Sequence, residues 1–166
     1  MQSSESDSQK NVIVLGAGNF GTCLAHHLAK NRNSVELWSR DATIAEAINK
    51  THKNPKYLNQ FILAKPLKAT NKISQKLFDS AEAVVIATPT QSLQHVLMAI
   101  KPFVRPGLTI ICAAKGIDTG TLKLPIATIG DVLGQNYENA AVFLSGPSFA
   151  EEIMHGYPTA VVVASY

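Results

Sequence analysis

A short apolar run that ends in three spaced glycines constrains the fold of this chain more than any other feature. Residues 12–15 read Val-Ile-Val-Leu and favour a buried strand, because β-branched and aliphatic side chains fit a covered sheet. The pattern Gly-x-Gly-x-x-Gly follows at residues 16–21, and residues 22–29 favour a helix. A strand, a glycine-rich turn and a helix in this order predict a site for a dinucleotide pyrophosphate. The alternative is a glycine-rich turn that binds no ligand.

Each glycine has its own expected role in such a site. Gly16 permits the tight turn out of the strand, and Gly18 lets the backbone approach the phosphates. Gly21 lets the helix pack closely against the strand. The helix start would then offer unpaired N–H groups and the positive end of its dipole to the anion.

Strand-like and helix-like segments alternate along the rest of the chain. This alternation predicts an α/β fold with a Rossmann-type, doubly wound and mainly parallel sheet, covered on both faces. Strands are expected at residues 12–15, 34–38, 67–69, 83–87, 109–113, 141–144 and 159–164. Helices are expected at residues 20–30, 42–50, 73–79, 89–100, 122–133 and 147–154. Asp41 is expected to cap the second helix, and residues 51–66 look irregular, with Asn54-Pro55 as a turn signal.

Composition excludes several classes of protein. The 166 residues suit one domain, and the net charge of +3 comes from dispersed basic residues that leave no nucleic-acid footprint. No apolar run approaches the ~20 residues that span a bilayer. Residues 1–10 are polar and serine-rich, without the apolar segment of a signal peptide, and we expect a disordered tail there and a cytoplasmic protein. Cys23 and Cys112 fall in a predicted helix and strand and are expected to be core thiols. No metal site is expected.

Beyond the glycines, Arg40 is the first candidate for a residue that distinguishes NAD from NADP. It stands at the end of the second predicted strand, where NAD-specific sites carry an acidic residue for the ribose 2′-OH. A guanidinium there could pair with the 2′-phosphate of NADP or lie flat on adenine. The alternative is a solvated loop arginine, and the sequence leaves NAD and NADP both open.

Two later segments look directed at a substrate. Lys115 follows a buried strand at its carboxyl end, where the sites of open α/β sheets gather, and an ammonium there suits a phosphate or a carbonyl oxygen. The alternative is a solvated loop lysine. Gly146, Pro147 and Ser148 follow the next strand and could form a second site for an anion or hydroxyl at a helix start. Together with Glu151, they could equally serve only to stabilise the N-terminus of the helix, without binding a ligand. 

Two further features are weaker evidence for a functional site. The loop at Thr88-Pro89 follows a buried strand, and its small residues would fit beside a cofactor. His95 falls inside a predicted helix, where a surface or core role is more common than a catalytic one.

Four motifs occur in order: Gly16-Ala17-Gly18-Asn19-Phe20-Gly21-Thr22, Asn54-Pro55-Lys56-Tyr57-Leu58, Ala114-Lys115-Gly116-Ile117, and Ser145-Gly146-Pro147-Ser148-Phe149-Ala150-Glu151. Together they resemble the bacterial NAD(P)-dependent glycerol-3-phosphate dehydrogenases, over nearly all of residues 11–166. The resemblance implies an extended dinucleotide-binding domain followed by a helical domain. It also implies interconversion of dihydroxyacetone phosphate and sn-glycerol 3-phosphate, which supplies glycerophospholipid synthesis.

The resemblance also assigns roles to single residues. The glycine-rich turn would hold the cofactor, two residues would flank its adenosine, and one lysine would contact cofactor and substrate. The implied cofactor-binding residues are Gly16, Gly18, Asn19, Phe20, Gly21, Arg40, Tyr57, Lys115 and Ala150. The implied substrate-binding residues are Lys115, Gly146 and Ser148.

The chain departs from the family in two places. The family often has Pro-Gly where this chain has Asn59-Gln60, which blurs the loop around Tyr57. The family's proton-transferring lysine lies in the C-terminal domain, so we expect no catalytic residue in this chain, an incomplete domain at 11–166 and an inactive fragment. The full-length protein is expected to be a homodimer. The alternatives are a 6-phosphogluconate or ketopantoate type of reductase with the same architecture, and a non-catalytic dinucleotide-binding module.

Overall fold

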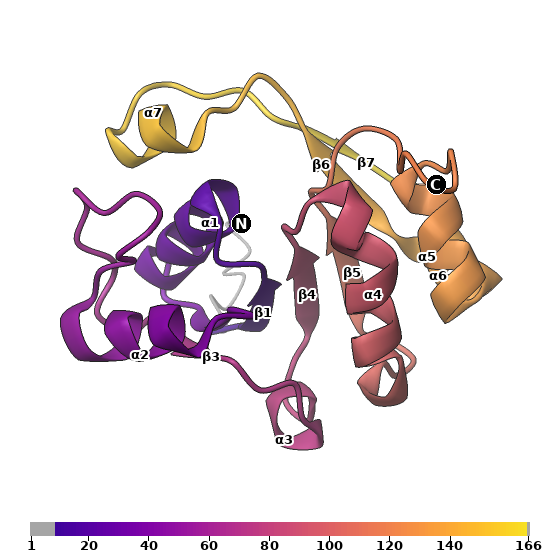
Figure 1. The fold of residues 1–166 in the computed structure, drawn as a ribbon, viewed down its shortest axis with the longest axis horizontal. Helices are drawn as coiled ribbons and strands as arrows, with labels where there is room; N and C mark the ends of the chain where they lie inside the picture. Colours follow the sequence, from indigo (N-terminus) through magenta and orange to yellow (C-terminus); the bar gives the residue numbers. More distant parts are fainter. Residues whose placement is uncertain (1–8, 166) are drawn as a thin grey trace, which may run out of the picture.

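The computed structural model describes residues 9–165 and places them around one seven-stranded sheet (Figure 1). The strands are β1 Asn11–Leu15, β2 Ser34–Trp38, β3 Lys68–Thr70, β4 Ala83–Ile86, β5 Thr109–Cys112, β6 Val142–Ser145 and β7 Val162–Ala164. The helices are α1 Asn19–Lys30, α2 Ala42–Thr51, α3 Gln75–Phe78, α4 Thr90–Ile100, α5 Pro125–Leu133, α6 Gln135–Ala140 and α7 Ala150–Met154, with a 3₁₀ turn at Lys101–Phe103. The expected disordered tail at 1–10 lies mostly outside the described residues.

The strand order is β3-β2-β1-β4-β5-β6-β7, which confirms the Rossmann-type, doubly wound prediction. Every neighbouring pair is parallel except β6 and β7, which pair antiparallel at the edge. The order reverses between β1 and β4, and ligands of open α/β sheets bind at such a switch point, outside the carboxyl ends of the strands. The fold therefore points to the region between the β1–α1 turn and the β4–α4 turn.

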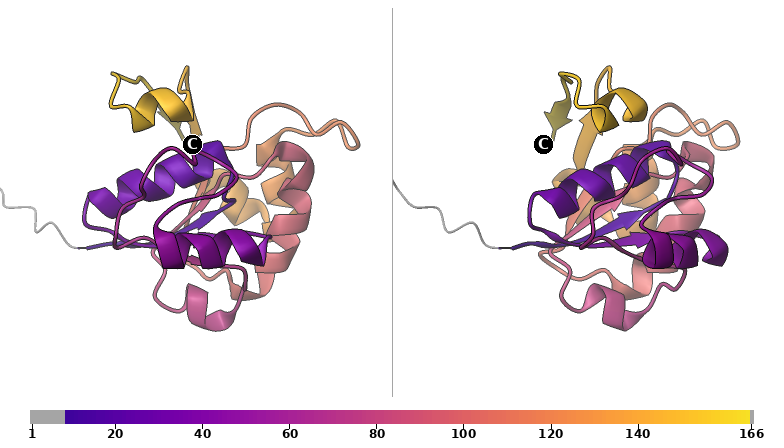
Figure 2. Two further views of the ribbon diagram at one scale, coloured as in Figure 1. Left: turned by 60° about the vertical axis from the view of Figure 1, so that its left-hand side comes forward. Right: turned by 90° about the vertical axis from the view of Figure 1, so that its left-hand side faces the viewer.

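Alternation along β1 divides the core into two layers. Val12 and Val14 pack on the side of α1 and α2, and Ile13 and Leu15 pack on the side of α3, α4 and α5. These side chains are almost fully buried, since both faces of a parallel sheet are covered by helices. Figure 2 shows the helices on either side of the sheet, with the yellow α7 lying apart from them.

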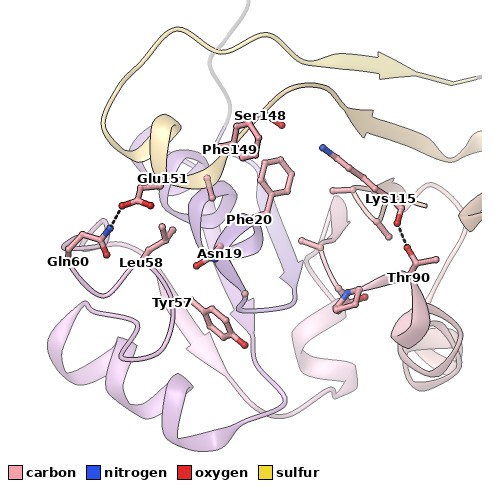
Figure 3. A pocket seen from close by; sticks show the side chains of 17 residues that line it. Asn19, Phe20, Tyr57, Leu58, Gln60, Thr90, Lys115, Ser148, Phe149 and Glu151 are labelled. Carbon is pink, nitrogen blue, oxygen red and sulfur yellow. Dashed lines mark hydrogen bonds between the residues drawn. The ribbon is translucent and has the colours of Figure 1, made fainter. Parts of the chain in front are cut away.

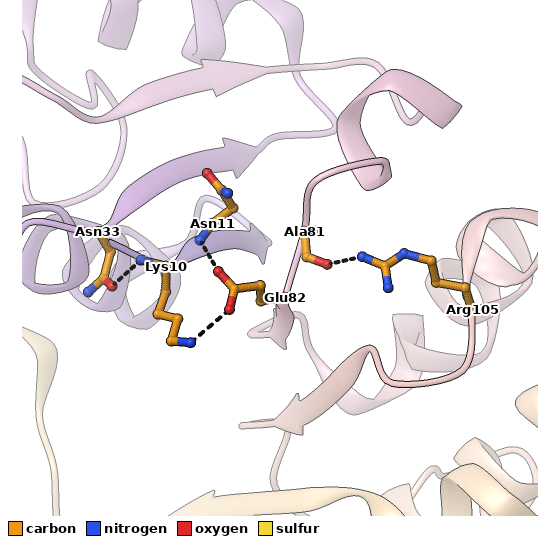
Figure 4. Close-up of polar contacts among 6 residues, drawn as sticks. All are labelled: Lys10, Asn11, Asn33, Ala81, Glu82 and Arg105. Atoms are coloured by element: carbon orange, nitrogen blue, oxygen red, sulfur yellow. Dashed lines mark hydrogen bonds and ion pairs between the residues drawn. The ribbon is translucent and has the colours of Figure 1, made fainter. Parts of the chain in front are cut away.

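The end of the sheet opposite the switch point is held by polar contacts (Figure 4). The Lys10 ammonium lies 2.8 Å from a carboxylate oxygen of Glu82, and the other oxygen accepts the Asn11 N–H. These contacts lower the pKa of the Glu82 carboxyl. The Arg105 guanidinium donates to the Ala81 carbonyl at 2.8 Å. Lys10, placed by the sequence in the tail, is thus tied to the strands.

Besides the segment after β6, three helical segments differ from the sequence expectation. The helix expected from 122 begins at Pro125, because Leu122 has a φ of 57° and Asp118 closes a turn by accepting the Thr121 N–H. Gly134, with a φ of 106°, ends α5 and starts the unexpected α6. The helix expected at 73–79 is limited to Gln75–Phe78.

The last strand is shorter and more exposed than expected. β7 covers Val162–Ala164 rather than 159–164. Val162 and Val163 are 62% and 64% exposed, and they lie on the outer strand of the described sheet. An apolar cavity of about 500 Å³ opens beside β7, between β5, β6 and the start of α5.

Candidate functional site

The glycine-rich turn has the geometry that the sequence predicts. Gly16 has a φ of 115°, and a Cβ there would lie 2.7 Å from the Ala87 carbonyl oxygen. A Cβ on Gly21 would collide with the Gly16 carbonyl, because α1 starts directly against the turn. A Cβ on Gly18 would meet nothing within 4 Å. Two glycines are thus needed by the protein itself, whereas the space beside Gly18 is open.

That open space belongs to a cavity of about 710 Å³ at the carboxyl ends of the strands (Figure 3). This volume is in the range of cofactor and ligand sites. Asn19 and Phe20 form its floor, and the loops after β4 and β5 form one wall. Tyr57 and Ala150 line the cavity from two other segments.

The residues present fit a dinucleotide. The cavity passes the N-terminus of α1, a helix of 12 residues whose N-cap is Gly18 and whose first turn has no acidic residue. The positive end of that helix dipole is therefore available to a phosphate. Thr88 lines the cavity, and its buried Oγ1 has no hydrogen-bond partner in the described part of the chain. A bound ligand with polar atoms could supply that partner.

Asn54 joins the Tyr57 segment to the glycine-rich turn. Its fully buried side chain donates to the Ala17 carbonyl at 3.0 Å and to Thr22 Oγ1 at 2.9 Å. Its Oδ1 accepts the N–H groups of Lys56 and Tyr57 at 3.1 Å. The sequence indicates only a turn here, because a pairing with a residue more than thirty positions away leaves no local signal. Asn54 is the main structural residue of the site that sequence reasoning missed.

Lys115 spans the gap between two strand ends. Its Nζ donates to the Gly146 carbonyl at 3.0 Å and lies 5.6 Å from the centre of the Phe20 ring. Lys115 and Phe20 both line the cavity, and Figure 3 shows the lysine side chain extending toward the Phe20 ring. Lys115 is exposed, and these two contacts direct its ammonium toward the cavity.

The segment after β6 differs from the expected helix start. α7 begins at Ala150, with extended Phe149 as its N-cap, so Pro147 is not in a first helical turn. Gly146 has a φ of 138°, and the Ser148 N–H donates to the Gly146 carbonyl at 2.9 Å. The Ser148 N–H is therefore already bonded and lies before the helix, so it does not serve as a helix-start donor for an anion. Ser148 itself still lines the cavity.

The remaining predicted residues lie at different distances from the cavity. Ala150 lines it, whereas Gly146 reaches the site through its carbonyl. Arg40 is exposed at the end of β2 and is not among the residues that line the cavity. Tyr57 is half-buried, with the Lys56 ammonium 5.6 Å from its ring centre. Most of the predicted set therefore lines the cavity, and the members that do not are Gly16, Gly21, Arg40 and Gly146.

Two segments far apart in sequence meet at the rim. Gln60 Nε2 donates to Glu151 Oε1 at 2.8 Å, and both residues line the cavity (Figure 3). The rings of Phe61 and His155 meet edge to face, with centres 4.9 Å apart. Gln60 is one of the two positions at which the chain departs from the family pattern. The departure therefore adds a contact across the rim.

The other titratable candidates lie away from the cavity. Burial raises the pKa of the Cys23 and Cys112 thiols to about 11, which confirms inert core thiols. His95 is exposed on α4. No cluster of three or more potential metal ligands occurs among residues 9–165. In the same range, no helix has the length and apolar character that a membrane crossing requires.

Fold and site together define a dinucleotide-binding domain of the Rossmann type, with a lysine directed toward the cofactor cavity. The family model "NAD-dependent glycerol-3-phosphate dehydrogenase N-terminus" matches residues 11–166. The chain belongs to this family.

Relatives and solved structures agree with that assignment. The chain is 38% identical over 153 residues to glycerol-3-phosphate dehydrogenase [NAD(P)+] of Myxococcus xanthus, covering 92% of the chain and 45% of the relative. It is 40% identical over 152 residues to the same enzyme of an Anaeromyxobacter strain, covering 92% and 46%. The crystal structure of glycerol-3-phosphate dehydrogenase from Coxiella burnetii has a TM-score of 0.83 at 27% identity, covering 93% of this chain and 46% of that one. The chain therefore spans less than half the length of these relatives.

The competing reductase class is similar in fold alone. A 2-dehydropantoate 2-reductase from Enterococcus faecalis, described as putative, has a TM-score of 0.58 at 16% identity. Its structure covers the common sheet but gives no support for that activity in this chain.

Proposed function

We propose that the chain is the cofactor-binding part of an enzyme that interconverts dihydroxyacetone phosphate and sn-glycerol 3-phosphate with NAD(P)H. The reaction would supply glycerophospholipid synthesis in the cytoplasm, and the full-length enzyme would be a homodimer. The observation that carries the proposal is Lys115, whose ammonium lies between the cofactor cavity and the Gly146 carbonyl. Family membership and the names of the relatives support the choice of substrate.

The residues of the chain would divide the work of binding. The glycine-rich turn and the N-terminus of α1 would hold the pyrophosphate, and Tyr57 and Arg40 would flank the adenosine. A bound nicotinamide would supply or accept the hydride. Lys115 has three N–H donors and uses one on Gly146, so two remain for a phosphate or carbonyl oxygen of the substrate.

Proton transfer is the step for which the described site offers no group. The cavity lining includes one lysine, which is assigned to binding, and one carboxylate, that of Glu151, which accepts a hydrogen bond from Gln60 at the rim. A positioned general base typically contributes about 10²–10⁴-fold. We therefore propose that this base lies outside residues 1–166 and that the chain binds its ligands without turnover.

The test is a two-step titration of the 166-residue chain. NADH and NADPH are first titrated by fluorescence, and dihydroxyacetone phosphate is then added to the NADH complex. Lys115→Ala should weaken binding of dihydroxyacetone phosphate roughly tenfold or more, as expected for a hydrogen bond to a charged group. Lys101→Ala, at the exposed 3₁₀ turn after α4, is the matched control and should leave affinity unchanged.

Three results would contradict the proposal. Absence of NADH and NADPH binding would remove the cofactor assignment. Equal substrate affinity in the chain and in Lys115→Ala would make Lys115 a solvated lysine. Steady NADH consumption by the chain with dihydroxyacetone phosphate would refute the claim that the base lies elsewhere.

A further inference from the structure

The hydroxyl of Thr90 makes a contact that a residue at the start of a helix does not ordinarily make. Ser and Thr at a helix start usually cap a free N–H of their own helix. Thr90 is the first residue of α4, but the N-cap is Pro89 and no side-chain cap bond occurs. Its hydroxyl instead donates to the Lys115 carbonyl at 2.6 Å, across 25 positions of sequence. Thr90 is 5% exposed and lines the cavity, and its bond to Lys115 is partly buried.

The Thr90 bond fixes the backbone of Lys115, while a second hydrogen bond fixes its ammonium group. The Lys115 ammonium donates to the Gly146 carbonyl at 3.0 Å. Thr90, Lys115 and Gly146 follow β4, β5 and β6, so the two bonds connect the ends of three adjacent strands. Figure 3 shows the Thr90 bond below the lysine and the ammonium at the opposite end of its side chain.

The two residues directly after Lys115 are exposed and precede a hydrogen-bonded turn at residues 118–123. Gly116 has a φ of 92°, and a Cβ there would meet nothing within 4 Å. Ile117 is 54% exposed. The backbone at Lys115 therefore lies between the buried β5 and an open loop, and the Thr90 bond sits at the junction.

We propose that Thr90 is a positioning residue for Lys115. Its hydroxyl fixes the lysine backbone, so that the ammonium stays between Phe20 and Gly146 where the substrate phosphate or carbonyl would lie. This inference rests on the proposed function for the identity of the ligand. The bond and its effect on the loop can be tested without any ligand.

Isosteric and conservative variants separate positioning from structure. Thr90→Val removes the hydroxyl and keeps the shape, whereas Thr90→Ser keeps the hydroxyl. Thr128→Val is the matched control, because Thr128 is also buried and its hydroxyl also donates to a carbonyl, that of Leu124, the N-cap of α5. Each variant is made in the 166-residue chain, and its unfolding midpoint is measured first.

The ligand-free measurement is ¹⁵N relaxation of the Gly116 and Ile117 amides. Thr90→Val should lower the heteronuclear NOE at both amides, and Thr90→Ser should restore it. Thr128→Val should leave both amides as they are. An unchanged NOE in Thr90→Val would overturn the proposal, whatever the chain binds.

The binding measurement uses dihydroxyacetone phosphate added to the NADH complex. Thr90→Val should weaken its affinity roughly fivefold, the factor that corresponds to one typical hydrogen bond, while NADH affinity changes less than about twofold. Thr90→Ser should restore the affinity. A loss of NADH affinity alone would mean that Thr90 serves the cofactor, and equal losses for both ligands would mean a general structural role. Either result would overturn the proposal.

The two measurements also separate this inference from the proposed function. If the unsubstituted chain binds no dihydroxyacetone phosphate, the proposed function fails. The relaxation data would then still decide whether the Thr90 hydroxyl orders the Lys115 loop.

Discussion

At the scale of single residues, Gly18 and Gly21 differ in whether the fold leaves room for a side chain at their position. A Cβ on Gly18 meets open space, whereas a Cβ on Gly21 collides with the Gly16 carbonyl. Gly18→Val should therefore keep the unfolding midpoint near that of the unsubstituted chain but abolish detectable NADH binding, because its side chain fills the phosphate position. Gly21→Val should lower the midpoint itself. Thermal unfolding and NADH titration of both variants check this, and unimpaired NADH binding by Gly18→Val would contradict the assignment.

Arg40 decides the choice between cofactors if its guanidinium meets the 2′-phosphate. Arg40 is exposed and lies outside the cavity lining, so little in the protein holds it. A charged hydrogen bond contributes about 1.5–3 kcal/mol, or roughly ten- to a hundredfold in affinity, with the lower value expected at an exposed position. Arg40→Ala should then weaken NADPH more than NADH in parallel titrations. Equal losses for the two would indicate adenine stacking instead.

At the scale of elements, α1 and the irregular segment at 51–66 are coupled through a neutral histidine. His26 Nδ1 accepts the Ala64 N–H at 3.1 Å. Burial, then the nearby His27 and Lys30, lower the pKa of His26 from 6.5 to about 4. The same burial also lowers the pKa of His27. Protonation of His26 removes the acceptor and releases the segment.

The sign of the resulting pH dependence follows from that lowered pKa. Between about pH 6.5 and 4 the unfolded chain binds a proton at this position and the folded chain does not. The free energy of unfolding should therefore be constant above 6.5, for this group, and fall as the pH drops toward 4. His26→Asn, which keeps an acceptor, should flatten the curve in chemical denaturation, whereas His95→Asn on the exposed face of α4 should not. Identical slopes in the chain and in His26→Asn would disprove the coupling.

Asn54 connects the glycine-rich turn to the Tyr57 segment, and the proposed cofactor would contact both. Asn54→Ala leaves the buried Ala17 carbonyl without this donor and frees the Tyr57 N–H. Unsatisfied buried groups cost about 1–3 kcal/mol, so the free energy of unfolding should fall by that amount and NADH affinity should fall with it. Asn59→Ala, exposed in the same segment, should change neither. A stable Asn54→Ala chain with normal NADH affinity would show that the connection is dispensable.

At the scale of the whole molecule, local pattern accounts for the sheet and for much of the site. The sequence could predict three features because each depends on local conformation. They are the strand at 12–15, the glycine-rich turn and the position of the residues that follow each buried strand. Asn54 and Gln60 act through partners that only the folded chain brings near. The helix expected at 147–154 begins only at Ala150, because its start is decided by Gly146 and the Ser148 turn rather than by the proline.

The exposed edge strand has a consequence for the handling of this protein in solution. β7 presents a free row of backbone N–H and C=O groups, flanked by Val162 and Val163, on the outer side of the described sheet. Such an edge is a template for pairing with the edge of another molecule. We expect light scattering of the concentrated chain to rise with time, and Val163→Lys, a gatekeeper charge, to suppress that rise. Equal scattering by both chains would place the associating surface elsewhere, and suppression by Val163→Lys would identify the β7 edge as that surface.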